Sequence, residues 1–260
     1  MRWILEKAID VEVGTINFLT QELDAWKQPY SVIQFVPFSH ELFPEVDRSE
    51  NLFPLGTTSL IRLAQQEHWK PGVFLNYDFD QRIWSRELTA FTLNESTFSQ
   101  LADAVLVEDK MFIRPTSPIN SFGGQVVSRD CFDAWRESAY ELPTNGYDSV
   151  TPDTMVALSP VKKIDSEYQV FVVSGKPVTA SRYRFHGVPM HRNADLNNEL
   201  LIAATAVCDH WLPHPHCVLD FANTEQGMRL IEINCLNCSG FYRCDIRKLV
   251  SELVNATKAI

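Results

Sequence analysis

Three oxygen-bearing side chains, Asp220, Glu232 and Asn234, lie on either side of a predicted turn in the last third of the sequence. Glu232 and Asn234 are two residues apart, so both side chains project from the same face of a strand. Asp220 lies on the other side of the turn at nearly the same distance from it. Carboxylate and amide oxygens form a hard ligand set that suits magnesium or manganese and does not suit zinc. The spacing therefore predicts a metal site, with a polar sheet face turned to water as the alternative.

The turn itself is indicated by Asn223, Thr224 and Gly227, which separate the apolar segments CVLDFA and MRLIEIN. Such residues favour a reversal of the chain, so the two segments are expected to pair as a β-hairpin. Glu232 lies between two isoleucines in the second segment. A carboxylate in an otherwise apolar strand is more often turned inward and partnered than left idle, which favours the metal site.

The segment from Asp220 through LIEINCLNCSG resembles the closing metal-binding signature of ATP-grasp enzymes, an acidic strand followed by EIN. The resemblance covers about residues 100–245 of the chain. It implies that ATP is bound together with Mg²⁺ (or Mn²⁺). It also implies that Asp220, Glu232 and Asn234 hold the metal between the β- and γ-phosphates.

The strand KMFIRP is similar to the family's strand of the type vvKP, whose basic side chain reaches the α- and β-phosphates. Arg114 stands here in place of lysine, a departure that resembles the divergent R2K clade of ATP-grasp proteins. The fork of an arginine favours bidentate contact with phosphate. Lys110, just before the strand, is a second candidate cation, with a solvated lysine as the alternative.

The segment SPINSFGGQVVS follows this strand and is similar to the flexible loop that covers the phosphates in the family. Ser121 would add a hydroxyl donor, and Gly123 and Gly124 would let the backbone approach the phosphates closely. Two glycines in this setting are also typical of a plain hairpin turn.

The segment MVALSPVKKIDSEYQVFVV resembles the hinge between the two ATP-grasp lobes, whose backbone recognises adenine. The resemblance assigns Glu167 to the ribose hydroxyls, because it matches the acid at the start of the next strand. Lys163 is the expected nucleotide contact near the hinge, and Lys162 is its alternative. A solvated pair of lysines at a strand end explains the same residues.

Arg182 and Arg184 are two residues apart in ASRYRF, so both are expected on one face of a strand. We assign them as catalytic residues that meet the transferred phosphoryl group or the substrate carboxylate. A sheet face held by salt bridges is the alternative.

Two further patterns have simpler explanations. Residues 55–59, LGTTS, precede a predicted helix and would hold an anion on free N–H groups, but ordinary helix capping explains them as well and is preferred. Cys235-x-x-Cys238, with Cys244 and two histidines nearby, lacks the two matched ligand pairs of a structural zinc site. Buried or incidental thiols are therefore expected.

The elements that must position these residues follow from hydrophobic periodicity and turn signals. In the first 85 residues we expect a helix over 16–27, a strand over 31–36, a helix over 56–69 and a strand over 72–79. This alternation predicts a small open α/β sheet. Beyond it we expect helices over 94–104, 128–142 and 195–211, strands over 110–115, 155–164, 217–222 and 228–234, a turn and strand over 119–128, and a hairpin over 167–185.

Together these elements predict an α+β fold. With the resemblance, the expectation becomes an ATP-grasp fold, two α+β lobes clasping ATP, preceded by a small α/β pre-ATP-grasp lobe. The expected divisions are the pre-ATP-grasp lobe over 1–85, the N-terminal ATP-grasp lobe over 86–158, and the C-terminal lobe with the metal site over 159–260. In the family the first lobe commonly helps to bind the acceptor.

Composition narrows the possible partners. The 260 residues carry a formal net charge of −10, which argues against a nucleic-acid partner held through its phosphates. No segment approaches the roughly 20 apolar residues of a membrane span. The start, MRWILEKAIDVEVG, has no apolar run of signal-peptide length, so we expect a cytoplasmic protein with reduced thiols.

The function implied is an ATP-dependent carboxylate–amine ligase that forms an amide or peptide bond through an acyl phosphate. The substrates would be a small-molecule or peptide carboxylate and an amine; an amino acid, a peptide and a protein terminus are all compatible. A phosphotransferase or kinase on the same fold, and a nucleotide-binding module without catalysis, are the alternatives. No motif in the sequence indicates an oligomeric state.

Overall fold

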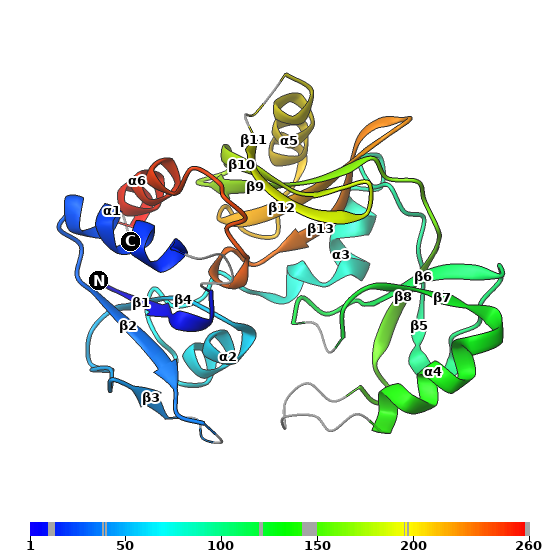
Figure 1. Ribbon diagram of the computed structural model, residues 1–260, viewed down its shortest axis with the longest axis horizontal. Helices are drawn as coiled ribbons and strands as arrows, with labels where there is room; N and C mark the ends of the chain where they lie inside the picture. The colour runs from blue at the N-terminus through cyan, green and yellow to red at the C-terminus, as the bar shows by residue number, and fades with distance from the viewer. Residues whose placement is uncertain are drawn as a thin grey trace.

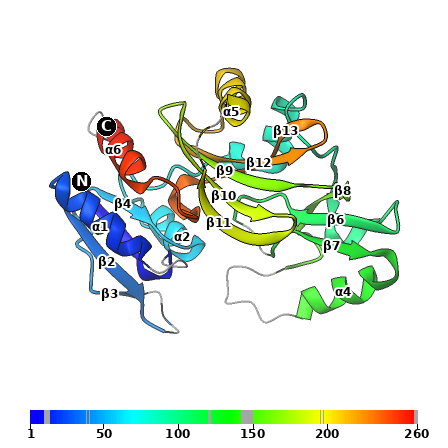
Figure 2. The same ribbon diagram turned by 45° about the horizontal axis from the view of Figure 1, so that its top comes forward.

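Three β-sheets, which follow one another along the chain, organise the molecule (Figure 1). The structure is a computed structural model that describes residues 1–9, 14–37, 39, 41–119, 122–141, 150–194, 196 and 198–257. The first sheet and the second sheet lie apart from each other, and the third sheet bridges them (Figures 1 and 2).

The first sheet has the order β3-β2-β1-β4, with parallel pairing of β1 to β2 and β4 and an antiparallel β3 at its edge. Its strands are β1 (Arg2–Glu6), β2 (Tyr30–Phe35), β3 (Leu42–Phe43) and β4 (Leu52–Leu55). Helix α1 (Thr15–Ala25) packs with Trp3 and Leu5 of β1, whereas α2 (Thr58–Gln66) packs with Ile4, which points the other way. The two helices therefore cover opposite faces, and the predicted open α/β sheet is confirmed.

The second sheet is antiparallel throughout, in the order β5-β8-β6-β7. Its strands are β5 (Thr97–Gln100), β6 (Lys110–Pro115), β7 (Gln125–Ser128) and β8 (Met155–Pro160). Helix α4 (Arg129–Glu141) covers one face, where Phe132 packs with Met111 and Ile113 of β6. Because side chains alternate along β6, this packing turns Phe112 and Arg114 to the opposite face.

The third sheet has the order β11-β10-β9-β12-β13 and is also antiparallel. Its strands are β9 (Ser166–Val173), β10 (Lys176–Phe185), β11 (Val188–Ala194), β12 (Cys217–Thr224) and β13 (Gly227–Asn234). The hairpin predicted over 167–185 is present as β9 and β10, which Ser174 and Gly175 join with positive φ angles of 51° and 74°. Positive φ at both loop residues matches the twist of paired strands.

Helices cover the two faces of the third sheet unequally. Helix α5 (Asn198–His210) packs over the face that carries Val170 and Leu219. On the other face, Phe171 and Val218 pack with α6 (Ile246–Thr257) and with α1 of the first sheet. Further along the same face, Glu167, Gln169 and Asp220 line the candidate site.

The predicted strand over 72–79 is wrong. The N–H of Phe74 donates to the side-chain oxygen of Asn237 at 2.8 Å, not to a neighbouring strand, and Phe74 is buried against His214 at a ring-centroid distance of 4.8 Å. Asn76 accepts a hydrogen bond from the N–H of Asp78 at 2.8 Å and begins a 3₁₀ turn, η2 (Tyr77–Phe79). Side-chain amides satisfy the backbone that the apolar pattern assigned to a sheet.

The predicted helix over 94–104 is also wrong. Its first part is β5, whose Thr97 and Phe98 pair with Leu158 and Ala157 of β8, and its second part is a 3₁₀ turn, η3 (Leu101–Asp103). Pairing with the edge of an existing sheet overrides the weak helical preference of NESTFSQ. Some elements were not predicted separately from the sequence. These are β1, β3, β4, β11, α3 (Gln81–Glu87), α6, η1 (Lys7–Ile9) and η4 (Leu236–Cys238).

Among the described residues, no helix combines the length and apolarity needed to cross a bilayer. The divisions near residues 85 and 158 stay predictions. An ion pair crosses both divisions: Arg247 of α6 pairs with Glu22 of α1, with Nε and Oε1 3.2 Å apart. The end of the chain thus packs on the first sheet.

Candidate functional site

A cavity of about 650 Å³ lies where elements of the three sheets approach one another. This volume is within the range of small-molecule sites. Its walls come from β6, the β8–β9 connection, β9, β10, the β12–β13 hairpin and the segment after η4, with Thr58 of α2 at one side. The following residues predicted from the sequence line it: Arg114, Gly124, Glu167, Arg184, Asp220, Glu232 and Asn234.

The three predicted metal ligands meet at one end of this cavity. Asp220 of β12 lies directly opposite Glu232 of β13, and Asn234 is two residues further along β13. The amide Nδ2 of Asn234 donates a hydrogen bond to Asp220 Oδ2 at 3.2 Å. From the second sheet, the guanidinium of Arg114 forms an ion pair with the carboxylate of Glu232. The site therefore joins groups from two lobes.

A β-bulge in β13 makes this meeting possible. Phe221 pairs with Leu230 but Asp220 pairs with Glu232, so Ile231 is an extra residue in the ladder. With unbroken pairing, Asp220 would lie opposite Ile231, and Glu232 would point to the other face of the sheet. Bulges are common beside functional sites because they re-aim a side chain in this way.

The charge environment of Asp220 favours a bound cation. Its side chain is buried, and burial raises the pKa of this carboxyl well above its usual range, with the nearby Glu232 and Glu167 raising it further. Arg114 and the hydrogen bond from Asn234 oppose the shift. Within the part of the chain that the structure describes, Asp220 Oδ1 has no hydrogen-bond partner. A buried carboxylate oxygen without a partner fits a metal ion.

The donor set fits magnesium better than a metal held by protein alone. Among the described residues, no three His, Cys, Asp or Glu side chains form a metal-binding group. Two carboxylates and an amide oxygen are few ligands, and Mg²⁺ typically completes its octahedron with water and substrate phosphates. Cys235 is unsuited to this role, because it is buried and that burial raises the pKa of its thiol well above the usual range.

A second bulge lies in β10 on the other side of the cavity. Arg182 pairs with Tyr168, whereas Arg184 pairs with Glu167, so Tyr183 is the extra residue. Arg184 lines the cavity, and its NH1 donates to Glu167 Oε1 at 3.2 Å. Arg182 is not among the lining residues.

The expectation that Arg182 and Arg184 share one face is wrong, and the bulge is the reason. Arg182 lies over the ring of Phe185 at 4.7 Å and directs its NH2 to Met190 Sδ at 3.4 Å. These contacts are those of a cation packed on an aromatic ring. A role for Arg182 at the transferred phosphoryl group therefore has no geometric support.

Tyr183 also lines the cavity, and the sequence pattern did not predict this. Burial raises the pKa of its phenol well above the usual range, and the carboxylates of Asp220 and Glu167 add to the shift. The predicted ribose-binding acid, Glu167, therefore lies beside Tyr183 and also accepts the hydrogen bond from Arg184. Because only the bulge directs Tyr183 into the cavity, period-two counting could not have found it.

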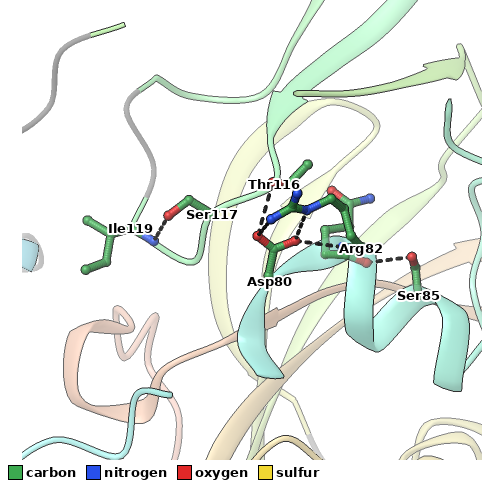
Figure 3. Close-up of polar contacts among 7 residues, drawn as sticks. Asp80, Arg82, Ser85, Thr116, Ser117 and Ile119 are labelled. Carbon is green, nitrogen blue, oxygen red and sulfur yellow. Dashed lines mark hydrogen bonds and ion pairs between the residues drawn. The ribbon is translucent and has the colours of Figure 1, made fainter. Parts of the chain in front are cut away.

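The segment that follows β6 is anchored just beyond Arg114 (Figure 3). Asp80, at the N-cap of α3, accepts hydrogen bonds from Arg82 and from the hydroxyl of Thr116 at 3.3 Å. The N–H of Gln81 donates to the carbonyl oxygen of Thr116 at 2.9 Å. These contacts fix the chain two residues beyond Arg114, on the side of the cavity where α3 lies.

Only part of the predicted glycine loop lines the cavity. Gly124 lines the cavity, and a Cβ at this position would lie 2.5 Å from the ring of Phe112, so any larger residue here would displace that ring. A Cβ on Gly123 would meet nothing within 4 Å, and Gly123 is not a lining residue. Ser121 lies outside the described residues. Lys110 is exposed at the far end of β6 and does not line the cavity.

At the β8–β9 connection the two candidate lysines separate. Lys162 lines the cavity, between Val161 and Ile164. Lys163 does not: its Nζ lies 3.3 Å from Glu225 Oε1 in a pair whose side chains are 89% and 85% exposed. The geometry thus favours Lys162, the alternative, as the residue in reach of a ligand.

At residues 55–59, a carboxylate of the chain itself takes the place of a bound anion. Glu6 of β1, which is buried, accepts hydrogen bonds from the N–H of Thr57 at 2.6 Å and from its hydroxyl at 2.9 Å. Thr57 forms no side-chain cap of its own. A carboxylate from the chain itself therefore occupies the favourable N-terminus of α2, while Thr58, one residue on, lines the cavity.

Comparison with known proteins agrees with this geometry. A family model described as ATP-grasp domain, R2K clade family 3, matches residues 32–253. No curated protein matches the chain. Among solved structures, D-cycloserine synthetase DcsG is 14% identical with a TM-score of 0.62, over 98% of this chain and 99% of that one.

Two other solved structures extend the comparison. D-alanine–D-alanine ligase from Bacillus anthracis, complexed with ATP, is 15% identical with a TM-score of 0.60, over 100% of this chain and 98% of that one. The ATP-grasp ligase PsnB, complexed with a precursor peptide and AMPPNP, is 11% identical with a TM-score of 0.54, over 98% and 97%. At these identities the likeness shows the fold, which is the ATP-grasp fold expected from the sequence. Because the family model spans most of the sequence, the chain belongs to family 3 of the R2K clade of ATP-grasp domains.

Proposed function

We propose that the protein is an ATP-dependent carboxylate–amine ligase. The observation that carries this proposal is the convergence of Arg114 from one lobe with Asp220, Glu232 and Asn234 from the other, at the end of a cavity of small-molecule size. Fixed cations and a hard ligand set on facing walls are what a magnesium nucleotide requires. The solved structures with this fold include ligases, one of them complexed with ATP.

The cavity walls suggest how ATP is held. Apolar side chains from the second sheet and the β8–β9 connection form one wall that suits a flat base: Phe112, Val126, Pro160, Val161 and Ile164. Glu167 is proposed to accept hydrogen bonds from the ribose hydroxyls. Arg114 and Glu232 pair with each other, and each is able to exchange that partner, Arg114 for a phosphate and Glu232 for the metal.

The proposed metal ligands are Asp220, Glu232 and Asn234. When bound, Mg²⁺ (or Mn²⁺) neutralises phosphate charge and stabilises the charge that develops on the phosphoryl oxygens. The chain's own contribution is positioning: Arg114 fixes the phosphates, and Arg184 lies where it neutralises a substrate carboxylate or the phosphoryl group.

The reaction proposed for ATP is a two-step transfer. A substrate carboxylate oxygen attacks the γ-phosphorus, the bond from that phosphorus to the β–γ bridging oxygen breaks, and ADP leaves. An amine nitrogen then attacks the acyl carbon, loses a proton, and displaces inorganic phosphate, which leaves an amide. Little covalent help is needed from the protein, so positioning and charge neutralisation suffice.

Calorimetric titration of ATP with and without Mg²⁺ tests the nucleotide site. We compare the native chain with Glu232→Gln, and with Glu225→Gln as a matched control, because Glu225 is exposed in the turn of the same hairpin. Magnesium-dependent binding should be lost in Glu232→Gln and kept in Glu225→Gln. Equal affinity in both variants would remove the metal assignment.

Product analysis separates ligase from phosphotransferase. With ATP, Mg²⁺ and panels of amino acids and peptides, a ligase releases ADP and phosphate and forms an amide. A kinase on the same fold releases ADP and leaves a stable phosphorylated product. Nucleotide binding without ADP release from any panel member would support a non-catalytic module.

A further inference from the structure

A second cavity of about 850 Å³ lies outside the proposed nucleotide site. One wall is the face of α1 that carries Thr15, Phe18 and Glu22, and the other is β11. Residues 243–247, which lead into α6, close its end. The cavity is therefore formed between α1 and the edge of the third sheet. Figures 1 and 2 show α6, which follows the closing segment, beside α1.

This cavity is cationic in an acidic protein. Arg192, Arg243 and Arg247 line it together with the two acids Glu22 and Asp245. Both acids have partners within the fold: Glu22 pairs with Arg247 at 3.2 Å, and Asp245 Oδ1 accepts the N–H of Lys248 at 3.0 Å in the first turn of α6. Arg192 is exposed, and its backbone pairs with Arg182 of β10. In a chain of net charge −10, such a surface selects anionic ligands.

The second wall is an open sheet edge. β11 is the last strand in the order β11-β10-β9-β12-β13, and within the described residues its outer side pairs with no other strand. His191, Arg192 and Asn193 of this strand all line the cavity. An exposed edge offers N–H and C=O groups in strand spacing, to which an extended peptide adds as a further strand.

The segment after η4 connects the two cavities. Tyr242 lines the first cavity, and its ring lies 5.4 Å from Tyr183 there and 4.9 Å from His191 of the second cavity. Arg243, the next residue, lines the second cavity. Both residues have positive φ angles, 42° and 63°, which non-glycine residues seldom adopt and which cluster at functional sites.

We propose that the second cavity binds the acidic part of a peptide substrate, extended along β11, and leads its reacting group past Tyr242 to the first cavity. This inference rests on the ligase function proposed above and names its substrate class. Arg192 and Arg243 pair with carboxylates of the peptide. A free phosphate would satisfy the arginines but not the open edge of β11, which is why a peptide is the chosen occupant.

The test uses calorimetric titration of the full chain with AMPPNP and Mg²⁺ present. The probes are a blocked pentapeptide with two glutamates, its glutamine counterpart, the glutamate peptide with N-methylated backbone amides, and inorganic phosphate. We expect the glutamate peptide to bind at least about tenfold more tightly than the glutamine and N-methylated peptides. Arg192→Gln/Arg243→Gln should remove that preference, and Lys248→Gln, exposed in α6 and not a lining residue, should keep it.

Three results would overturn the inference: no binding of the glutamate peptide, equal binding to the double variant and the native chain, or displacement of the peptide by equimolar phosphate. Unchanged affinity for the N-methylated peptide would overturn the strand pairing along β11. AMPPNP affinity is measured in the same experiments. Loss of peptide binding with intact nucleotide binding refutes this inference alone, whereas absence of nucleotide binding refutes the proposed function.

Discussion

Two β-bulges flank the candidate nucleotide site, and they act in opposite directions. In β13 the extra residue Ile231 turns Glu232 to the face that carries Asp220, and so brings two carboxylates together. In β10 the extra residue Tyr183 separates Arg182 from Arg184, which a regular strand would place on one face. Both extra residues line the same cavity.

The difference teaches what a residue count along a strand is able to predict. Period-two alternation orders side chains within one unbroken ladder, and a single inserted residue reverses every assignment beyond it. The hairpin prediction was right for Asp220 and Glu232 because their distances from the turn differ by the one residue that the bulge absorbs. The same reasoning failed for Arg182 because nothing in ASRYRF marks the insertion.

The largest effect is expected from shifting the register of β13 beyond its bulge. Insertion of an alanine between Ile231 and Glu232 moves Glu232 and Asn234 by one position relative to β12, so that both point away from Asp220. We expect magnesium-dependent ATP affinity to fall by at least about 100-fold in calorimetry, since two of three proposed metal ligands are lost.

Its control is Ile231→Ala, which keeps the extra residue and hence the register. We expect that variant to retain nucleotide affinity and to lose only part of its packing. Circular dichroism and thermal unfolding identify an insertion variant that does not fold. A folded insertion variant with native affinity would mean that the register beyond the bulge does not organise the metal site.

The next largest effects are expected from replacing the three arginines near the cavity, which should differ in their influence on ATP binding and turnover. Arg114→Ala should weaken ATP binding by about 10- to 100-fold, the usual range for a charge-assisted contact to phosphate. Arg184→Ala should have a smaller effect on ATP binding and a larger one on turnover. Arg182→Ala should leave nucleotide affinity within about twofold and lower the free energy of unfolding by roughly 0.5–1 kcal/mol through the lost contact with Phe185.

If Arg182→Ala and Arg184→Ala weaken turnover equally while both variants stay folded, the separation of these side chains by the β10 bulge has no functional meaning. Arg129→Ala, at the start of α4, provides a matched arginine that does not line the cavity; its NH2 donates to the carbonyl of Val107 at 2.9 Å.

A third effect concerns Tyr183, the extra residue of β10. Because its folded pKa is raised, the folded state keeps the phenol proton above pH 10 while the unfolded chain releases it. Stability is therefore fully present below pH 10 and falls as the pH rises through the folded pKa, by up to roughly 1.4 kcal/mol per pH unit. Tyr183→Phe should flatten this slope in urea unfolding measured from pH 9 to 11.

The matched variant is Tyr77→Phe, because Tyr77 is 74% exposed. Its stability slope with pH should equal that of the native chain. Equal slopes for Tyr183→Phe and the native chain would contradict the burial of the Tyr183 phenol between the carboxylates, and with it the orientation that the bulge gives to this residue.

The sequence predicts a site residue well when its neighbours in the chain determine its conformation, and poorly when contacts with distant residues determine it. KMFIRP forms β6 with the predicted bounds, because its alternation is matched by one buried and one cavity-facing side. GVFLNYDF has an equally strong apolar pattern, but its backbone bonds to Asn237, which lies 163 residues from Phe74. Likewise, Glu6 occupies the N-terminus of α2 from a distance of 51 residues. Contacts of this separation leave no local signature.

A small effect on nucleotide binding is expected at Asp80, where a strand reaches the site without any bulge. β6 pairs with β7 and β8 in regular register, so the direction of Arg114 follows from alternation, and Asp80 only anchors the chain beyond it (Figure 3). Asp80→Ala removes the N-cap of α3 and the acceptor for Thr116, which should lower the free energy of unfolding by about 1–2 kcal/mol. We expect ATP affinity to change by less than about threefold, because the ladder still directs Arg114. A loss of affinity as large as that of Arg114→Ala, in a folded variant, would show that anchoring at the strand end, and not register, positions this side of the site.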